Sequence, residues 1–138
     1  MKNDNFQSSK PANISFQELS KNVPDSKVIS LPQPIAAYYH ASDTYDAALL
    51  AACFAENAIL VDEGEEYHGA KAVSEYILKA NKDANVMTDI TNCAEKNGMT
   101  VVTATISGDF DGSPVPLDFY FTLANDKIKT LSIILAGE

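Results

Sequence analysis

The spacing of hydrophobic residues changes from helical to strand-like near Asn85. Upstream of this point, apolar side chains recur every three or four residues, as on the buried face of a helix. Pro34 suits a first helical turn, and Ile35 and Tyr38 follow at helical spacing. Downstream, segments rich in Val, Ile, Thr, Phe and Tyr are separated by clusters of turn-forming residues. The pattern therefore predicts helices first and a sheet after them.

Two further helices and one short strand are predicted between the first helix and the sheet. Ser42 and Asp43 interrupt the first helix, and the second helix is expected to end at Asn57. Residues 58–61 form a short apolar run typical of a strand, and the acidic stretch that follows them is predicted to be a turn. A third helix is expected from about Lys71. The second helix is expected to bury a stripe made of Tyr45, Ala48, Leu49, Ala52 and Cys53.

Four long strands make up the rest of the predicted sheet. The links between them are short and rich in Gly, Asn and Asp, so consecutive strands must pair antiparallel. Helices gathered on one face of an antiparallel sheet define the α+β class. A curved sheet wrapped around three helices would leave a conical hollow between the two layers. The predicted strands span residues 86–95, 99–110, 115–124 and 127–135.

The first 33 residues differ in composition from the remainder. They are polar and contain Pro11, Pro24 and Pro32, and their short apolar segments are too small to form a core. We interpret residues 1–33 as a polar N-terminal arm and residues 34–138 as the folded domain. The arm is either loose or laid across the main body. Whether it covers the mouth of the hollow stays open.

Composition and charge restrict the class of partner. A chain of 138 residues with 46% hydrophobic residues suits one globular domain. Its net charge of −9 repels nucleic acid and anionic membrane surfaces, and Lys and Arg form no cluster that would offset this repulsion. Apolar runs fall well short of the roughly 20 residues of a membrane helix. The N-terminus lacks the apolar core of a secretory signal. We therefore expect a cytoplasmic protein that binds neither nucleic acid nor membrane.

The cysteines and histidines suggest no metal or cofactor site. Cys53 and Cys93 are distant in sequence and are expected to be free thiols in the core, although a disulfide remains possible. His40 is expected on the surface, and His68 in a capping or structural role before the third helix. Metal-ligand spacing, glycine-rich phosphate loops and a nucleophile elbow are all missing from the sequence. We therefore expect a protein without a cofactor.

One part of the sequence resembles a known superfamily. The stretch of residues 53–62, Cys-Phe-Ala-Glu-Asn-Ala-Ile-Leu-Val-Asp, followed by Tyr67-His68-Gly69 and a helix, is similar to the nuclear transport factor 2-like superfamily. That group includes SnoaL-like polyketide cyclases, ketosteroid isomerases, scytalone dehydratase and limonene epoxide hydrolase. The resemblance covers residues 34–138 and implies a cystatin-like cone. This fold hosts enzymes and noncatalytic modules alike, so it does not fix the function.

Comparison with the ketosteroid isomerases suggests particular site residues. In that family an aspartate at the end of the first strand moves a proton, while a tyrosine and a neutral aspartate stabilise the oxyanion. A gapless comparison places the base at Asp62 and the tyrosine at Tyr38. The third position is open between Asp118 and Phe119. Strand alternation favours Phe119 in the hollow, with Asp118 facing the other way.

The residues themselves support both a functional and a structural interpretation of these positions. Alternation places Leu60 and Asp62 on one face, and a carboxylate at the edge of an apolar pocket loses solvation, which raises its pKa toward a useful range. Asp62 also begins an acidic run with Glu63, so it is alternatively part of a solvated turn. Tyr38 is either a hydrogen-bond donor in the pocket or a core tyrosine with its hydroxyl satisfied by a neighbour.

Two functions are consistent with this sequence. The first is a cofactor-free isomerase, cyclase or dehydratase that acts on a small apolar carbonyl compound, with Asp62 and Tyr38 as catalytic residues. The alternative is a noncatalytic ligand-binding or dimerisation module of the same fold. Under either function we expect a homodimer that forms through the outer face of the sheet. The apolar positions expected on that face are Tyr120, Val101 and Ile133.

Overall fold

The computed structural model describes residues 29–137. Residues 1–28, which form most of the predicted N-terminal arm, lie outside the described residues. The first half of the described chain contains α3 (Gln33–Thr44), α4 (Ala47–Ala52), β1 (Phe54–Asp62), β2 (Glu65–His68) and α5 (Ala70–Asp83). The second half contains β3 (Met87–Lys96), β4 (Met99–Ser107), β5 (Val115–Ala124) and β6 (Lys127–Leu135).

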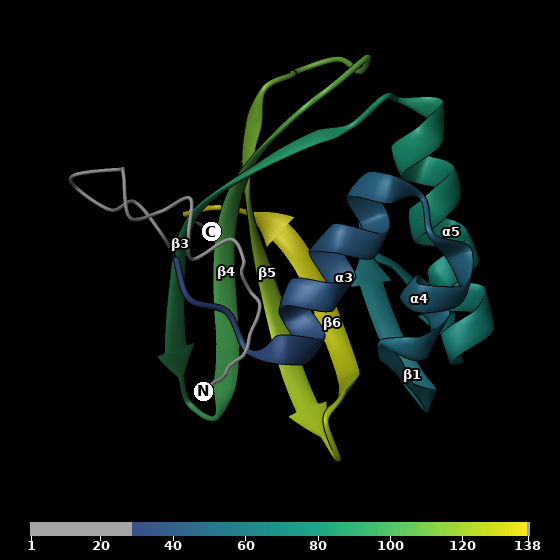
Figure 1. The fold of residues 1–138 in the computed structure, drawn as a ribbon. Helices are drawn as coiled ribbons and strands as arrows, with labels where there is room; N and C mark the ends of the chain where they lie inside the picture. The colour runs from purple at the N-terminus through teal and green to yellow at the C-terminus, as the bar shows by residue number, and fades with distance from the viewer. Residues whose placement is uncertain (1–28, 138) are drawn as a thin grey trace, which may run out of the picture.

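The six strands form one curved sheet in the order β2-β1-β6-β5-β4-β3 (Figure 1). Strands β3 to β6 pair antiparallel with their sequence neighbours, as predicted. The pair β1–β6 is parallel and joins the first half of the chain to the second. Register shifts interrupt β1, β3 and β5, and such irregularities bend a sheet. The α+β fold class is therefore confirmed, with the parallel β1–β6 pair added.

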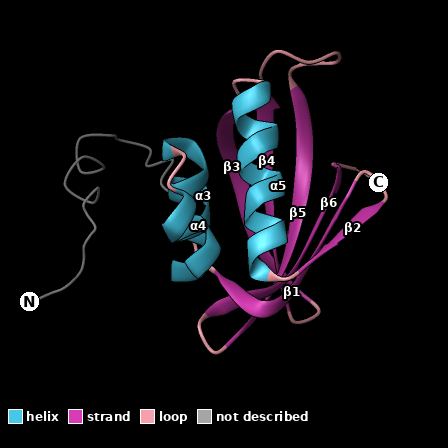
Figure 2. Ribbon diagram, turned by 90° about the vertical axis from the view of Figure 1, so that its right-hand side faces the viewer, coloured by secondary structure: helices cyan, strands magenta, loops and turns pink. Residues whose placement is uncertain are grey.

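The helices cover the concave face of this sheet. Helix α3 contacts β6, while α4 and α5 contact β1 (Figure 2). Alternation along the strands sends one set of side chains toward the helices, and this set forms the core. Fully buried members from the sheet include Phe121, Leu131 and Leu60, and α3 contributes Ile35. The hydrophobic layer between helices and sheet therefore matches the predicted two-layer arrangement.

The break between the first two helices falls later than predicted. Helix α3 continues through Ser42 and Asp43 and ends where Tyr45 adopts a left-handed backbone conformation. The side chain of Asp46 then caps α4 by accepting a hydrogen bond from the Leu49 backbone N–H at 3.1 Å. This new start resets the helical phase, so the predicted stripe was wrong in part. Tyr45, Ala48 and Ala52 are exposed, and α4 buries Leu50 instead. Cys53 is buried as predicted, and Leu49 is partly buried against the core.

The segment after α4 is more extended than predicted. The second helix does not reach Asn57, because β1 already begins at Phe54. The predicted turn is reduced to Glu63 and Gly64, both with positive φ, and β2 pairs antiparallel with β1 behind it. A Glu-Gly pair is a weak hairpin signal compared with Asn-Gly or Asp-Gly. The acidic composition of this segment therefore predicted a turn where the structure has strand β2.

The long strands of the second half match the prediction closely, except at the end of β4. This strand stops at Ser107 instead of continuing to Phe110. At Gly108 the chain passes against the loop that follows α5, where an added Cβ would lie 2.5 Å from the Ala84 carbonyl oxygen. The Asp109 backbone N–H donates to the same oxygen at 2.6 Å. This close approach ends the strand and directs Phe110 toward the helices.

The outer face of the sheet is less apolar than predicted. Ile133 pairs with Phe119 in β5 and faces the helices, so its predicted outward position was wrong. Tyr120 and Val101 do lie opposite each other on the outer face, although Val101 is already buried within the single chain. Both cysteines are free thiols, as expected. None of the helices in the described part of the chain combines the length and hydrophobicity needed to cross a membrane.

Candidate functional site

A cavity of about 870 Å³ lies between α3, α5 and the concave face of the sheet. This volume lies within the range of pockets that hold small organic molecules. Its walls are mostly aliphatic and aromatic. The sheet contributes alternate residues of its strands, among them Leu117 and Phe119 of β5, Ile106 of β4 and Ile133 of β6. The predicted hollow is therefore present.

Asp62 is the half-buried carboxylate of this cavity. It is the last residue of β1, shares the inner face with Leu60 and lies opposite Ile133 of β6. Burial raises the pKa of its carboxyl, and the negative charge of Glu63 acts in the same direction. A hydrogen bond from Tyr76 partly offsets this rise. Asp62 thus lies in the cavity wall rather than in a fully solvated turn.

Tyr76 holds one oxygen of that carboxylate. Its hydroxyl donates to Asp62 Oδ2 at 2.7 Å, and its ring stacks on Tyr67 of β2 with centroids 4.1 Å apart. Within the described chain, Asp62 Oδ1 has no side-chain hydrogen bond. Burial and the hydrogen bond to Asp62 raise the pKa of Tyr76 well above its ordinary value, so the hydroxyl stays protonated. Sequence reasoning did not connect Tyr76 with Asp62.

Tyr38 lies in the same cavity wall as predicted, on α3. Its ring is buried and packs edge-on against Phe54 and Phe121, at centroid distances of 6.0 and 5.6 Å. Burial, followed by the negative charge of Asp62, raises the pKa of its hydroxyl well above the ordinary value. The hydroxyl therefore remains neutral and can donate a hydrogen bond.

Two further hydroxyls on α3 are buried and have no hydrogen-bond partner among residues 29–137. Tyr39 Oη and Ser42 Oγ belong to residues that line the cavity. Ser42 lies near the Tyr38 hydroxyl, yet its Oγ makes no hydrogen bond of ordinary geometry. Native proteins satisfy most buried polar atoms, so unpaired ones at a cavity are unusual. Their sequence signal is limited to their positions, one and four residues after Tyr38.

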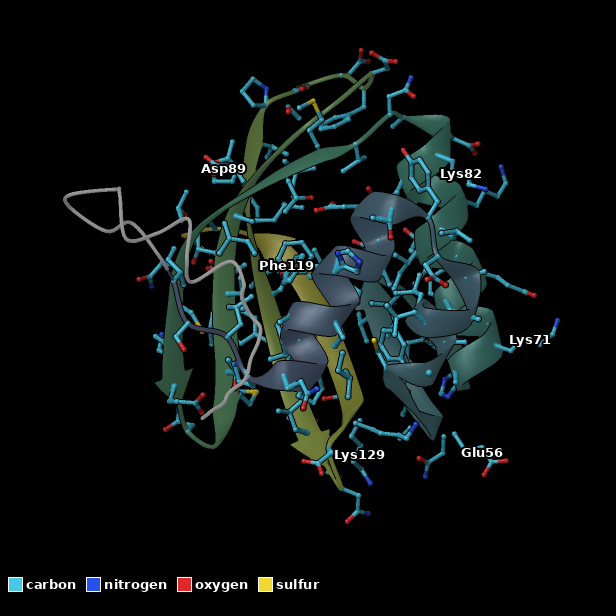
Figure 3. The ribbon with its side chains drawn as sticks, in the orientation of Figure 1. Glu56, Lys71, Lys82, Asp89, Phe119 and Lys129 are labelled. Carbon is cyan, nitrogen blue, oxygen red and sulfur yellow. The ribbon has the colours of Figure 1, made fainter. Side chains whose placement is uncertain are left out.

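The third polar position of the isomerase comparison is apolar here. Phe119 faces the cavity and packs edge-on against Tyr39 at a centroid distance of 5.6 Å; Figure 3 shows it in the middle of the molecule beside α3. Asp118 lies on the opposite face, where it accepts a hydrogen bond from Thr103 Oγ1 at 2.6 Å. The alternation argument for Phe119 is confirmed, and Asp118 does not belong to the site.

Neither histidine lies in the cavity. His40 is exposed, as expected. His68 is also exposed and contacts Glu66 at 3.1 Å, while Gly69 occupies the N-cap of α5 without a side-chain hydrogen bond. The expected capping role of His68 is therefore wrong. Among residues 29–137, no three His, Cys, Asp or Glu side chains are grouped so that they could hold a metal ion.

A curved six-stranded sheet with three helices on its concave face places the chain in the nuclear transport factor 2-like class. Residues 35–130 match the model of the SnoaL-like domain, so the chain belongs to the SnoaL-like domain family. No curated protein matches the sequence at a significant level.

Several solved structures share the fold. A protein of Sinorhizobium meliloti to which polyketide cyclase activity is ascribed is 31% identical, with a TM-score of 0.72, over 75% of this chain and 95% of that one. A Catenulispora acidiphila protein with a ketosteroid isomerase-like fold, solved in complex with trimethylamine, is 19% identical, with a TM-score of 0.66, over 78% and 88%. A cystatin-like protein from Methylobium petroleophilum is 15% identical, with a TM-score of 0.67, over 77% and 75%.

Proposed function

We propose that this protein is a cofactor-free enzyme that transfers a proton within a small, apolar carbonyl compound, as an isomerase, cyclase or dehydratase. The proposal agrees with the SnoaL-like family, in which isomerases and cyclases are common. It also agrees with the cyclase activity ascribed to the Sinorhizobium meliloti protein. The observation that carries it is the half-buried carboxylate of Asp62 in a cavity with mostly apolar walls.

Asp62 is the proposed general base. Partial desolvation raises the pKa of its carboxyl, which makes the carboxylate a stronger base than a solvated one. Tyr76 occupies Oδ2 and fixes the orientation of the group, so Oδ1 is the oxygen that accepts a proton from the carbon next to the carbonyl. The same carboxyl then returns the proton at a second position. An isomerisation is balanced by this return of the proton; in a dehydration the carboxyl would instead give the proton to the departing hydroxyl, which leaves as water.

Tyr38 is the proposed hydrogen-bond donor to the substrate oxygen. Removal of the proton leaves an enolate, whose negative charge needs a donor in a site from which water is excluded. Because its pKa is raised, the Tyr38 hydroxyl stays protonated and can supply that hydrogen bond. The neutral acid that serves as a second donor in ketosteroid isomerases is missing, since Phe119 occupies its position. We therefore expect slower turnover than in that family.

The test begins with ligands and continues with turnover. A panel of neutral cyclic ketones and enones is screened by thermal shift, and each binder is then assayed for double-bond isomerisation and ring closure. In the variant Asp62→Asn we expect bound ligand but a rate lower by about 10²-fold or more. Asp89→Asn is the matched control, because Asp89 lies exposed on β3 outside the cavity (Figure 3). Equal rates in both variants would remove Asp62 from the mechanism.

The alternative is a noncatalytic ligand-binding module. The apolar side chain of Phe119 favours it, because one of the expected oxyanion donors is replaced by a ring. Binding across the panel without turnover in the wild-type chain would support this alternative. Under either function we propose a homodimer through the outer face of the sheet, centred on Tyr120 of β5 and its neighbours.

A further inference from the structure

The charged residues that line the cavity are all acidic. They are Asp62 at the end of β1, Glu63 in the following turn and Asp111 in the loop between β4 and β5. Lys, Arg and His are missing from the described lining. The nearby lysines of α5 are engaged elsewhere: Lys79 pairs with Asp83, and the Lys82 ammonium lies 5.5 Å from the centroid of the Tyr45 ring. The interior therefore carries a negative potential that no lining cation offsets.

The walls add groups that favour a positively charged ligand. Three tyrosines and two phenylalanines line the cavity, and the faces of such rings attract ammonium groups, most strongly where water is excluded. A cation that enters would also compensate the carboxylate of Asp62, which has lost part of its hydration without gaining a charged partner. The five aromatic residues are Tyr38, Tyr39, Tyr76, Phe110 and Phe119.

Two hydroxyls of α3 that belong to lining residues are buried. Tyr39 Oη and Ser42 Oγ lie in residues that are less than one-tenth exposed, and neither has a hydrogen-bond partner within residues 29–137. Because both oxygens are covered, the polar contact of a ligand falls to Asp62 Oδ1, which Tyr76 leaves free. An ammonium group carries N–H donors only, so it matches this acceptor.

We propose that the cavity binds apolar amines in their ammonium form and rejects carboxylates of the same shape. The ammonium lies against Asp62 Oδ1, and the hydrocarbon part contacts the aliphatic and aromatic walls. The inference depends on the same cavity and the same carboxylate as the proposed function, but it requires no turnover. A neutral ketone occupies the same space without the charge pair, so it binds more weakly than the amine.

The experiment compares three ligands with the same ring and different charge. Cyclohexylmethylamine, cyclohexyl methyl ketone and cyclohexanecarboxylate are titrated into the full-length protein at pH 7 and low salt, with binding followed by calorimetry. We expect the amine to bind about tenfold more tightly than the ketone, because a hydrogen bond to a charged group is stronger than one to a neutral group. We expect the carboxylate to show no binding. Equal affinity for amine and ketone, or binding of the carboxylate, would overturn the proposal.

Two variants assign the selectivity to Asp62. In Asp62→Asn the preference for amine over ketone falls to about equal affinity, while ketone binding and the melting temperature are retained. In Asp89→Asn the tenfold preference persists. A preference that survives Asp62→Asn contradicts the inference. Amine binding with no ketone turnover contradicts the proposed function alone, and ketone turnover with no preference for the amine contradicts this inference alone.

Discussion

At the scale of single residues, the pair formed by Asp62 and Tyr76 determines what the cavity can do. Burial raises the pKa of the Asp62 carboxyl, and the hydrogen bond from Tyr76 lowers it again in part. Tyr76 therefore helps to set how far the pKa of the Asp62 carboxyl lies above that of a solvated aspartate. It also fixes which oxygen is free to accept a proton.

Removing the Tyr76 hydroxyl is expected to move the pH profile of any activity. In Tyr76→Phe the hydrogen bond that lowers the pKa of Asp62 is lost, so this pKa rises further. The acidic limb of the pH profile of kcat/KM therefore moves to higher pH. Tyr67→Phe is the matched control, because its ring stacks on Tyr76 and would still do so without its hydroxyl. An acidic limb that is unchanged in Tyr76→Phe would contradict the assignment of this limb to Asp62.

The same carboxyl is expected to cost stability at neutral pH. An aspartate whose pKa is higher in the folded than in the unfolded chain binds its proton more tightly when folded, so folding stability falls as pH rises through its titration range. Asp62→Asn removes this titration, and the amide oxygen can still accept from Tyr76. We therefore expect a melting temperature at pH 7 equal to or above that of the wild type, with a smaller difference at pH 4. A lower melting temperature at pH 7 would contradict the desolvation argument.

Sequence pattern predicted part of this site at the residue scale. It offered the cavity wall as one of two placements for Asp62 and for Tyr38, and it favoured Phe119 over Asp118 in the hollow, because strand alternation and helical spacing fix direction. It did not predict the contact between Asp62 and Tyr76, which are fourteen residues apart on a strand and a helix. Side-chain hydrogen bonds of this kind depend on the packing of α5 against β1. This packing cannot be inferred from the local spacing of hydrophobic residues.

At the scale of elements, the start of α4 depends on one side chain. Asp46 accepts a hydrogen bond from the Leu49 backbone N–H, and the six-residue helix has little else to fix its first turn. Asp46→Ala is expected to lower the free energy of unfolding by about 1 kcal/mol, measured by urea denaturation. Asp46→Asn keeps an acceptor and should cost little. An equal loss of unfolding free energy in both variants would show that the charge of Asp46, rather than its capping hydrogen bond, stabilises the start of α4.

A second element-scale prediction concerns the end of β4. Gly108 lies where a Cβ would be 2.5 Å from the backbone oxygen of Ala84, so Gly108→Ala must push the loop after α5 away from the sheet. We expect a loss of about 1–3 kcal/mol in unfolding free energy and weaker ligand binding, because Val86 and Phe110 of the cavity wall flank this contact. Wild-type stability in this variant would contradict the proposed close approach.

The accuracy of the sequence-based prediction differs between helices and strands of the fold. The long strands after residue 85 were correct because their composition, alternation and turn residues all agree. The boundary between α3 and α4 was misplaced because Ser42 and Asp43 are poor helix residues, yet α3 buries Ser42 and continues to Thr44. Strand β2 was missed because two of its four residues are acidic and three are exposed. Its existence follows from pairing with β1, which is a tertiary effect.

At the scale of the whole molecule, the outer face of the sheet is the proposed contact between two copies of the chain. Tyr120 and Val101 lie opposite each other there, and Ile134 of β6 is also exposed. We expect a dimeric mass by light scattering at micromolar concentration, and a monomeric mass for Tyr120→Lys, whose charge would be buried in the interface. A monomeric wild-type protein at this concentration would contradict the proposed dimer.

The most direct test of the account measures proton removal itself, without knowledge of the natural substrate. Cyclohexyl methyl ketone is incubated with the protein in D₂O, and deuterium uptake next to the carbonyl is followed by NMR. The account predicts uptake faster than in buffer alone, a decrease of about 10²-fold or more in Asp62→Asn, and no decrease in Asp89→Asn. Uptake at the same rate in wild type and Asp62→Asn would contradict it.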